Sequence, residues 1–254
     1  PGSAHVMWTK TFQDGGIIGG DYWGVPSAAY YTGLSYEGKF NNPIIINGRL
    51  YYKAALSNSQ TAGPYMCVDL LTGETIWENN DINPTFGMIY LYESMNQHGA
   101  MEGYLVQTSG TTWRIFDSRT GIPLFNMTGV PSGFGGGFFG GSGSGVVGEY
   151  GEILNYQLNV NGRWLALWSS AAEPNTPLVA TPGNTTDAFQ YRPYGKNADM
   201  SQAYLWNITI PALPAGSSIQ MAIPNDILLL STTISSGFFG WGTNTYTMTA
   251  LGLN

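Results

Sequence analysis

The chain of 254 residues is poor in charge and has almost no cysteine. Asp, Glu, Lys and Arg together make up 10% of it, less than half of the roughly 25% usual in globular proteins. Nine Lys and Arg residues and a net charge of −7 leave no basic patch for phosphates, which argues against nucleic-acid binding. The single cysteine, Cys67, excludes an intramolecular disulfide and a cysteine-based metal site. Its apolar neighbours predict a buried thiol rather than a nucleophile.

Long apolar runs and helical periodicity are also scarce. No run of about 18 apolar residues is present, so no membrane-spanning helix is expected. Glycine (35 residues) and aromatic residues (14%) are abundant instead. This balance favours many short strands joined by tight turns, and we predict a single all-β domain over residues 1–254. Residues 1–6 are expected to be a tail left by processing or cloning.

A strand-turn-strand unit built around Asp-x-x-Thr-Gly occurs twice, over residues 67–77 and 115–125. In each copy an apolar strand ends in Asp, the chain turns on Thr-Gly, and a second strand ends in a large aromatic residue. The carboxylates are expected to accept backbone hydrogen bonds, and the glycines to adopt positive φ. These turn residues are Asp69, Gly73, Asp117 and Gly121.

Four turn signals at similar intervals divide the chain into repeats. Each precedes a short apolar or aromatic run, which is typical of a hairpin. The turns are Asn47-Gly48, Glu102-Gly103, Asn161-Gly162 and Asn225-Asp226. We align the run after each turn as the second strand of a four-stranded blade. In the third repeat this alignment leaves the third strand to lie within 171–203.

Large aromatic residues in the outermost strands are expected to pack between adjacent blades. These residues are Trp77, Phe125 and Trp206. The fourth repeat lacks such a strand at its end, but residues 7–12, which contain Trp8, match it. We therefore predict a small β-propeller of about four blades, closed by pairing of 7–12 with 245–251, which removes two sheet edges. Two alternatives remain: the chain is an open segment of a longer propeller, or strand 7–12 completes a neighbouring molecule and builds a filament.

Three insertions, 14–42, 131–145 and 171–203, read as loops. Gly-aromatic sequences recur within or near such loops. Exposed aromatic rings there would suit a protein contact or stacking on sugar rings, whereas the competing interpretation is that they fill the centre of the propeller. The candidate binding residues are Trp23, Phe138, Phe139, Phe238, Phe239 and Trp241.

Three Asn-x-Thr sequons begin at Asn126, Asn184 and Asn207. Together with the low charge they favour an exported, glycosylated protein, extracellular or at the cell surface. The sequon at Asn207 follows Trp206 in a predicted strand, where a chance match is the competing interpretation.

The Asp-x-x-Thr-Gly-x-x-x-Trp unit, preceded by Asn-Gly-Arg-Leu-Tyr-Tyr, resembles the repeat of quinoprotein-like (PQQ-like) β-propellers. Residues 43–79 match that pattern well, and 87–128 match it with Phe125 in place of Trp. The remainder matches only in strand pattern. The family includes cofactor-using dehydrogenases, outer-membrane assembly scaffolds and surface proteins. The resemblance implies a propeller fold. The dehydrogenases of the family carry a disulfide of adjacent cysteines, which a chain with one cysteine cannot form, so we expect no cofactor.

These observations favour an extracellular or cell-surface binding or structural scaffold that self-assembles through strand exchange or aromatic loops. We expect a protein partner, including a second copy of the chain, or a glycan. The alternative is a glycan-binding module or a glycoside-active enzyme, and a quinone-dependent oxidoreductase is the third hypothesis. No catalytic residue or metal ligand is assigned, because His98 and the scattered acids form no recognisable constellation.

Overall fold

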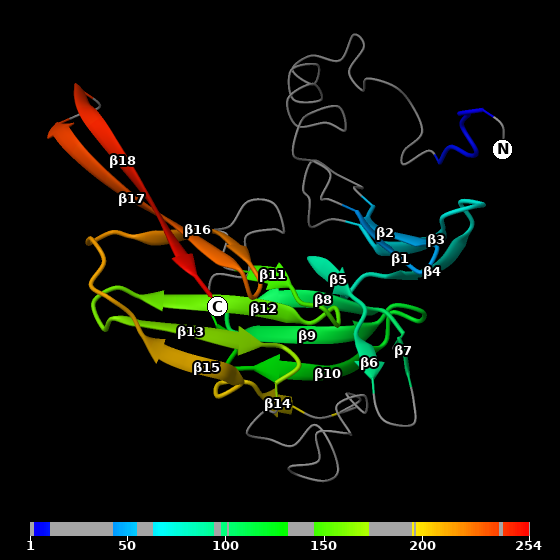
Figure 1. Cartoon of the computed structure of the whole chain (residues 1–254). Helices are drawn as coiled ribbons and strands as arrows, with labels where there is room; N and C mark the ends of the chain where they lie inside the picture. The colour runs from blue at the N-terminus through cyan, green and yellow to red at the C-terminus, as the bar shows by residue number, and fades with distance from the viewer. Residues whose placement is uncertain are drawn as a thin grey trace. The chain divides into compact units, whose positions relative to one another are not determined.

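The structure is a computed structural model of the chain, and the segments it describes contain β-strands and no helix (Figure 1). It describes residues 3–10, 43–54, 63–93, 98–100, 102–131, 145–172, 195, 197–238 and 241–253. The predicted all-β class is confirmed for these residues. None of them belongs to a helix of the length and apolarity needed to cross a membrane.

Residue contacts divide the chain into two compact units. The first comprises Pro1–Gly87, Gly103–Gln107 and Phe116–Ile122. The second comprises Met88–Glu102, Thr108–Ile115 and Pro123–Asn254.

The first sheet is an antiparallel meander in which neighbouring strands are also consecutive in the sequence. Its strands are β1 (Ile44–Ile46), β2 (Arg49–Lys53), β3 (Tyr65–Asp69) and β4 (Thr75–Asn79). Asn47 and Gly48 join β1 to β2 with φ values of 49° and 71°. Positive φ at both central residues is the type I′ geometry, whose twist matches that of the flanking strands. The Asn-Gly hairpin predicted here is therefore present.

The second sheet has five strands in the order β14-β10-β9-β8-β5. They are β5 (Phe86–Met88), β8 (Tyr104–Ser109), β9 (Thr112–Asp117), β10 (Pro123–Thr128) and β14 (Asn197–Asp199). Strand β14 runs parallel to β10, within the segment 171–203 that reads as a loop. Its sequence, Asn-Ala-Asp, has no strand preference, so pairing with β10 must be what extends it. A separate hairpin consists of β6 (Leu91–Glu93) and β7 (His98–Ala100).

The third sheet corrects the predicted alignment of its repeat. Its strands are β11 (Gly145–Val147), β12 (Ile153–Asn159), β13 (Trp164–Ser169) and β15 (Tyr204–Thr209), adjacent in that order. The run after Asn161-Gly162 is thus the third strand, β13, and not the second. The second strand, β12, follows a turn at Gly151, whose φ is 80°. That turn has no Asn-Gly pair, which is why the alignment missed it.

The fourth sheet has three strands among the described residues: β16 (Ser218–Ile223), β17 (Ile227–Phe238) and β18 (Trp241–Gly252). The predicted turn at Asn225-Asp226 joins β16 to β17, with Asn225 at φ 59°. Strand β16 pairs with β17 only as far as Ser231, whereas β18 follows β17 to the pair Phe238 and Trp241.

Four sheets of three to five strands therefore follow one another along the described chain, as predicted, but no closed ring is formed. Residues 3–10 contain no strand, and β18 is paired with β17 alone among the described strands. The predicted pairing of 7–12 with 245–251 is absent from the described residues, and residues 11–12 lie outside them. Instead, Trp8 and Lys10 contact the turn that follows β3.

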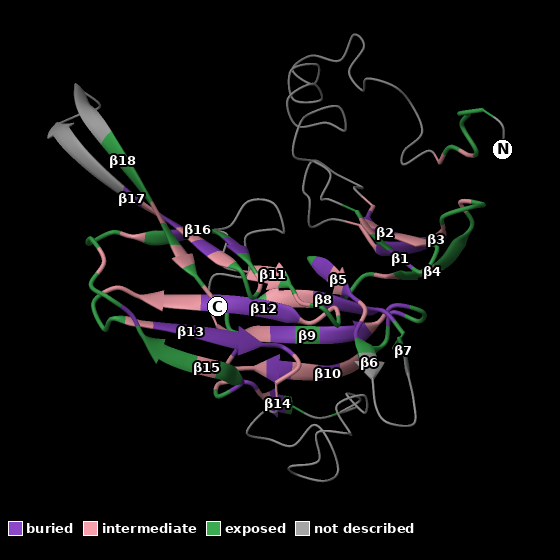
Figure 2. Ribbon diagram, in the orientation of Figure 1, coloured by how far each residue is buried: buried purple, intermediate pink, exposed green. Residues whose placement is uncertain are grey.

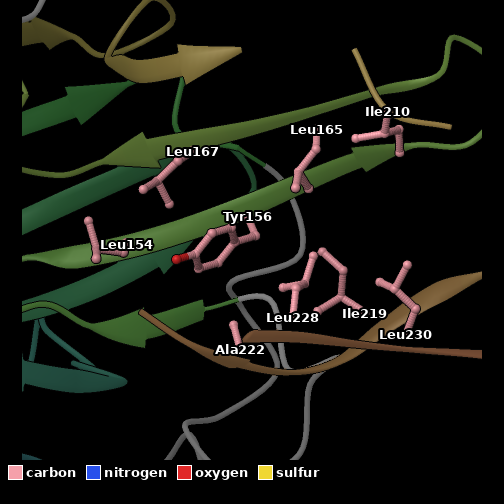
Figure 3. Packing of buried hydrophobic residues seen from close by; sticks show 9 residues of the cluster. All are labelled: Leu154, Tyr156, Leu165, Leu167, Ile210, Ile219, Ala222, Leu228 and Leu230. Carbon is pink, nitrogen blue, oxygen red and sulfur yellow. The ribbon is translucent and has the colours of Figure 1, made fainter. Parts of the chain in front are cut away.

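Buried residues gather in the strands of the sheets (Figure 2). In the second unit, nine of them form one cluster shared by the third and fourth sheets (Figure 3). They are Leu154, Tyr156, Leu165, Leu167, Ile210, Ile219, Ala222, Leu228 and Leu230. Each fully buried Leu or Ile side chain contributes about 1.5–3 kcal/mol. Two buried indoles, those of Trp113 and Trp168, also meet edge to face with ring centroids 5.6 Å apart.

Candidate docking site of the Trp8 segment

The turn after β3 is held by the carboxylate that ends the strand. The backbone N–H groups of Thr72 and Leu71 each donate to Oδ1 of Asp69 over 2.8 Å. These two hydrogen bonds favour the charged form, so they hold the pKa of the Asp69 carboxyl below its usual range. The Gly73 N–H donates to the Asp69 carbonyl over 2.8 Å, and Gly73 has a φ of 75°. This conformation is open to glycine at little cost.

The turn after β9 repeats this arrangement. Oδ1 of Asp117 accepts from the backbone N–H of Arg119 over 2.7 Å. The Gly121 N–H donates to the Asp117 carbonyl over 2.8 Å, and Gly121 has a φ of 69°. In both turns, therefore, a glycine at positive φ donates its N–H to the carbonyl of the aspartate four residues before it.

Trp77 of β4 lies on the second of these turns. Its indole Nε1 donates to the Ser118 carbonyl over 3.2 Å. Its ring covers Gly121 so closely that a Cβ there would lie 3.1 Å from Cζ3. Two residues further on, Asn79 Nδ2 donates to the Gly121 carbonyl over 3.2 Å. A tryptophan and the polar residue two positions after that tryptophan thus both donate hydrogen bonds to carbonyls of the turn.

Trp8 contacts the first turn in the same way. Its Nε1 donates to the Leu70 carbonyl over 2.9 Å, and a Cβ on Gly73 would lie 2.6 Å from its Cδ2. Lys10 Nζ lies 3.4 Å from the Gly73 carbonyl oxygen and 2.5 Å from Thr75 Oγ1.

The two sets of contacts correspond residue by residue. Leu70 and Ser118 each follow the turn aspartate, and Lys10 and Asn79 each stand two positions after the tryptophan. Residues 7–10, called the Trp8 segment below, therefore contact the Thr-Gly turn of the first sheet as the fourth strand of that sheet, β4, contacts the Thr-Gly turn of the second sheet.

The first and third sheets also contain matching rows of residues. In the first, Tyr51, Cys67 and Trp77 lie opposite one another across three strands. The rings of Tyr51 and Trp77 are 5.9 Å apart. The Cys67 side chain between them is fully buried, and burial raises the pKa of its thiol to about 11.

The third sheet has the matching row of Tyr156, Leu167 and Trp206. The rings of Tyr156 and Trp206 are 6.1 Å apart. A register shift just before each tryptophan leaves one exposed residue unpaired, Ile76 in β4 and Leu205 in β15. Trp206 therefore holds the place of Trp77 although its sheet lacks the Asp-x-x-Thr-Gly turn.

The remaining sequence-predicted residues fall in three described places or lie outside the described residues. Phe125 is buried in β10. Asn126 is half-buried in the same strand, and its Nδ2 donates to Oδ1 of Asn197 over 2.9 Å. Asn207 is exposed in β15. Phe238 and Trp241 lie opposite each other where β17 meets β18. Trp23, Phe138, Phe139, Phe239 and Asn184 lie outside the described residues.

Sequence reasoning missed the partners of the two tryptophans. Leu70 and Ser118 contribute backbone carbonyls, which any residue type would supply. A polar side chain two positions after each tryptophan, Lys10 or Asn79, is the signal that was available. Within the described segments, no three His, Cys, Asp or Glu side chains come together as a group able to hold a metal ion.

Comparisons with known proteins give little further information. No family model and no curated protein matches the chain. Among solved structures, it is similar to BamB from Moraxella catarrhalis at 9% identity and a TM-score of 0.30, over 75% of this chain and 45% of that one. It is similar to Hsv2p from Kluyveromyces lactis at 9% identity and a TM-score of 0.27, over 83% of this chain and 60% of that one. The chain spans less than two thirds of either structure, and neither likeness assigns a function.

Proposed function

We propose that the chain is a structural and binding scaffold of the β-propeller kind, and that its Trp8 segment is the fourth strand of the last blade. The observation that carries this proposal is the correspondence between two pairs of residues. Trp8 and Lys10 contact the first turn as Trp77 and Asn79, in the fourth strand of a sheet, contact the second. Because β4 is the last of four strands in its sheet, a segment equivalent to β4 is expected to follow three further strands of a sheet of its own.

The fourth sheet supplies those three strands. Its outer strand β18 has one unpaired edge among the described strands, and Tyr246 and Met248 on it are 68% and 62% exposed. An unpaired edge presents free N–H and C=O groups to a further strand. Pairing with the Trp8 segment would satisfy them and would give the fourth sheet the same number of strands as the first.

The buried core and the position of the turn before β17 together predict which residue of β18 lies opposite Trp8. Leu228 and Leu230 belong to the cluster shared with the third sheet. Side chains alternate along a strand, so Leu229 faces away from that cluster. Leu229 stands third after the turn Asn225-Asp226, as Tyr51 stands third after Asn47-Gly48, so we align these two residues. Leu229 pairs with Ala250, which places Trp8 opposite Ala250. By the register of β3 and β4, Thr9 then lies opposite Thr249.

A scaffold role accounts for how the repeated residues are used. The turn carboxylates accept hydrogen bonds from backbone N–H groups, and the indole N–H groups of the tryptophans donate to backbone carbonyls. Low charge and three sequons support a place at the cell surface or outside the cell. Exchange of the Trp8 segment between copies would provide self-assembly, because the same contacts form within one chain or between two.

Light scattering and electron microscopy across a concentration series test the scaffold role. We expect oligomers that grow with concentration in the native chain and are lost in Trp8→Ala. Met7→Ala is the matched control, because Met7 is 56% exposed beside Trp8, and it should assemble like the native chain. A strictly monomeric native chain at high concentration, or assembly that is unchanged in Trp8→Ala, would contradict self-assembly through this segment.

A further inference from the structure

We propose that Asn207 is an N-glycan attachment site of the folded protein and that Asn126 is not. Both begin an Asn-x-Thr sequon, and in the sequence alone the predicted strand around Asn207 counts against that site. Their positions in the sheets of the structure reverse this preference. The inference rests on the proposed location outside the cell, because glycan transfer to sequons takes place on exported chains.

Asn207 lies on the outer edge of a sheet. Strand β15 is the last strand of the third sheet and has one partner, β13, among the described strands. Asn207 and Thr209 are exposed there, and Asn207 stands opposite Ala166 of β13. The acceptor amide and the threonine hydroxyl are thus on an exposed strand, and a bulky glycan there would extend from a sheet edge that no described strand covers.

Asn126 lies on a strand that has a partner on each side. Strand β10 is paired on both sides, with β9 and with β14. The Asn126 Nδ2 donates to Asn197 Oδ1 over 2.9 Å, and the Thr128 hydroxyl donates to the Ala198 carbonyl over 3.4 Å. Both Asn126 and Thr128 are half-buried. A glycan on Asn126 would therefore disturb the contact between β10 and β14.

The modification is a group transfer that needs a lipid-linked sugar pyrophosphate as donor. The Nδ2 atom forms a bond to C1 of the first sugar and loses one proton. The bond between C1 and the pyrophosphate oxygen breaks, and the lipid pyrophosphate leaves with the electron pair. On β15 the glycan would stand beside two exposed apolar residues, Leu205 (55%) and Ile208 (49%). It would shield an edge strand that otherwise favours strand addition by other chains.

Secretion of the full chain from a eukaryotic host with its own glycosylation machinery tests the inference. Mass spectrometry of the secreted protein, before and after glycosidase treatment, should find glycan on Asn207 and none on Asn126. Thr209→Ala should remove the glycan from Asn207, and the matched Thr128→Ala should leave it in place. An unoccupied Asn207 in the secreted chain, or equal occupancy of Asn126, would overturn the proposal.

This outcome is independent of the scaffold role. Acceptor use in a supplied secretory pathway reports on Asn207 itself, whereas the native location is tested by fractionating the source cells. A chain that is glycosylated at Asn207 in the host but found inside the source cells would refute the proposed location and keep the acceptor assignment.

Discussion

The indole of Trp8 lies over Gly73 and donates to the carbonyl of Leu70, as the indole of Trp77 lies over Gly121 and donates to that of Ser118. One contact involves the first segment of the chain, and the other involves the last strand of the first sheet. Because the tryptophan, the glycine under its ring and the accepting carbonyl after the aspartate correspond in position, the two contacts are best explained as one interface used twice. Four predictions follow from it and from the core beside it.

The closeness of Trp8 to Gly73 predicts a strong effect of a single methyl group. Gly73→Ala would place Cβ 2.6 Å from the Trp8 ring and should release the Trp8 segment. Gly216→Ala is the matched control: Gly216 also has a positive φ, 81°, but nothing lies within 4 Å of its Cβ position. It should cost only the backbone term of about 1–2 kcal/mol. Urea unfolding and the tryptophan emission of both variants would show the difference, and equal losses would contradict the contact.

Trp77 stabilises its turn through both its ring and its N–H group. Trp77→Ala removes both and should lower the free energy of unfolding by about 3 kcal/mol. Trp77→Phe keeps a ring over Gly121 and loses the hydrogen bond to Ser118, which should cost about 1 kcal/mol. Chemical denaturation of the two variants measures these values. If Phe were as damaging as Ala, ring packing on the glycine would not be the main term.

Acid should loosen the Trp8 contact through Asp69. The hydrogen bonds from Thr72 and Leu71 lower the pKa of its carboxyl in the folded state, whereas an unfolded aspartate has a pKa of about 3.9. The stabilisation is therefore complete above that unfolded pKa and is lost as the pH falls through the lower folded value. Tryptophan emission followed from neutral pH downward should change in this acidic range. Asp69→Asn keeps an acceptor oxygen and should lose this dependence, so an unchanged acid transition would point to another group.

Cys67 should be inert until the first sheet unfolds. Its side chain is fully buried between Tyr51 and Trp77, and burial raises the pKa of the thiol to about 11. At pH 8 it is protonated and covered, so a thiol reagent such as a disulfide dye should react only at the rate of unfolding. Rapid labelling of the native chain would show that the row of Tyr51, Cys67 and Trp77 is open.

The parts of the fold that depend on local chemistry could be predicted from the sequence. Asn47-Gly48 and the two Thr-Gly turns contain the residue types that adopt positive φ most readily, so these turns can be identified from the sequence. The order of four sheets followed from them. Strand β14 could not be predicted, because its pairing with β10 joins residues about 70 positions apart and needs no strand-forming side chain.

For the candidate site, the sequence could predict the tryptophan positions but not the groups that they contact. The aromatic strand ends predict Trp8, Trp77 and Trp206 as equivalent positions, but the predicted alignment of the third repeat is wrong by one strand. The row from Tyr156 to Trp206 reveals the equivalence through register, and the Asp-x-x-Thr-Gly signal is absent there. The roles of Leu70 and Ser118 could not be predicted from the sequence, because both residues accept through backbone carbonyls, which every residue type has.

The central claim, that the Trp8 segment is the fourth strand of the last sheet, is tested most directly by a disulfide. In Thr9→Cys with Thr249→Cys, directly opposed strand residues have Cα atoms about 4.5–5.5 Å apart, within the range that a disulfide bridges. Mild oxidation should therefore link them, within one chain at low concentration and between chains as strand exchange sets in. The control pair, Thr9→Cys with Thr245→Cys, is four residues out of register and should remain reduced. Absence of the first disulfide, or equal yields from both pairs, would contradict the account.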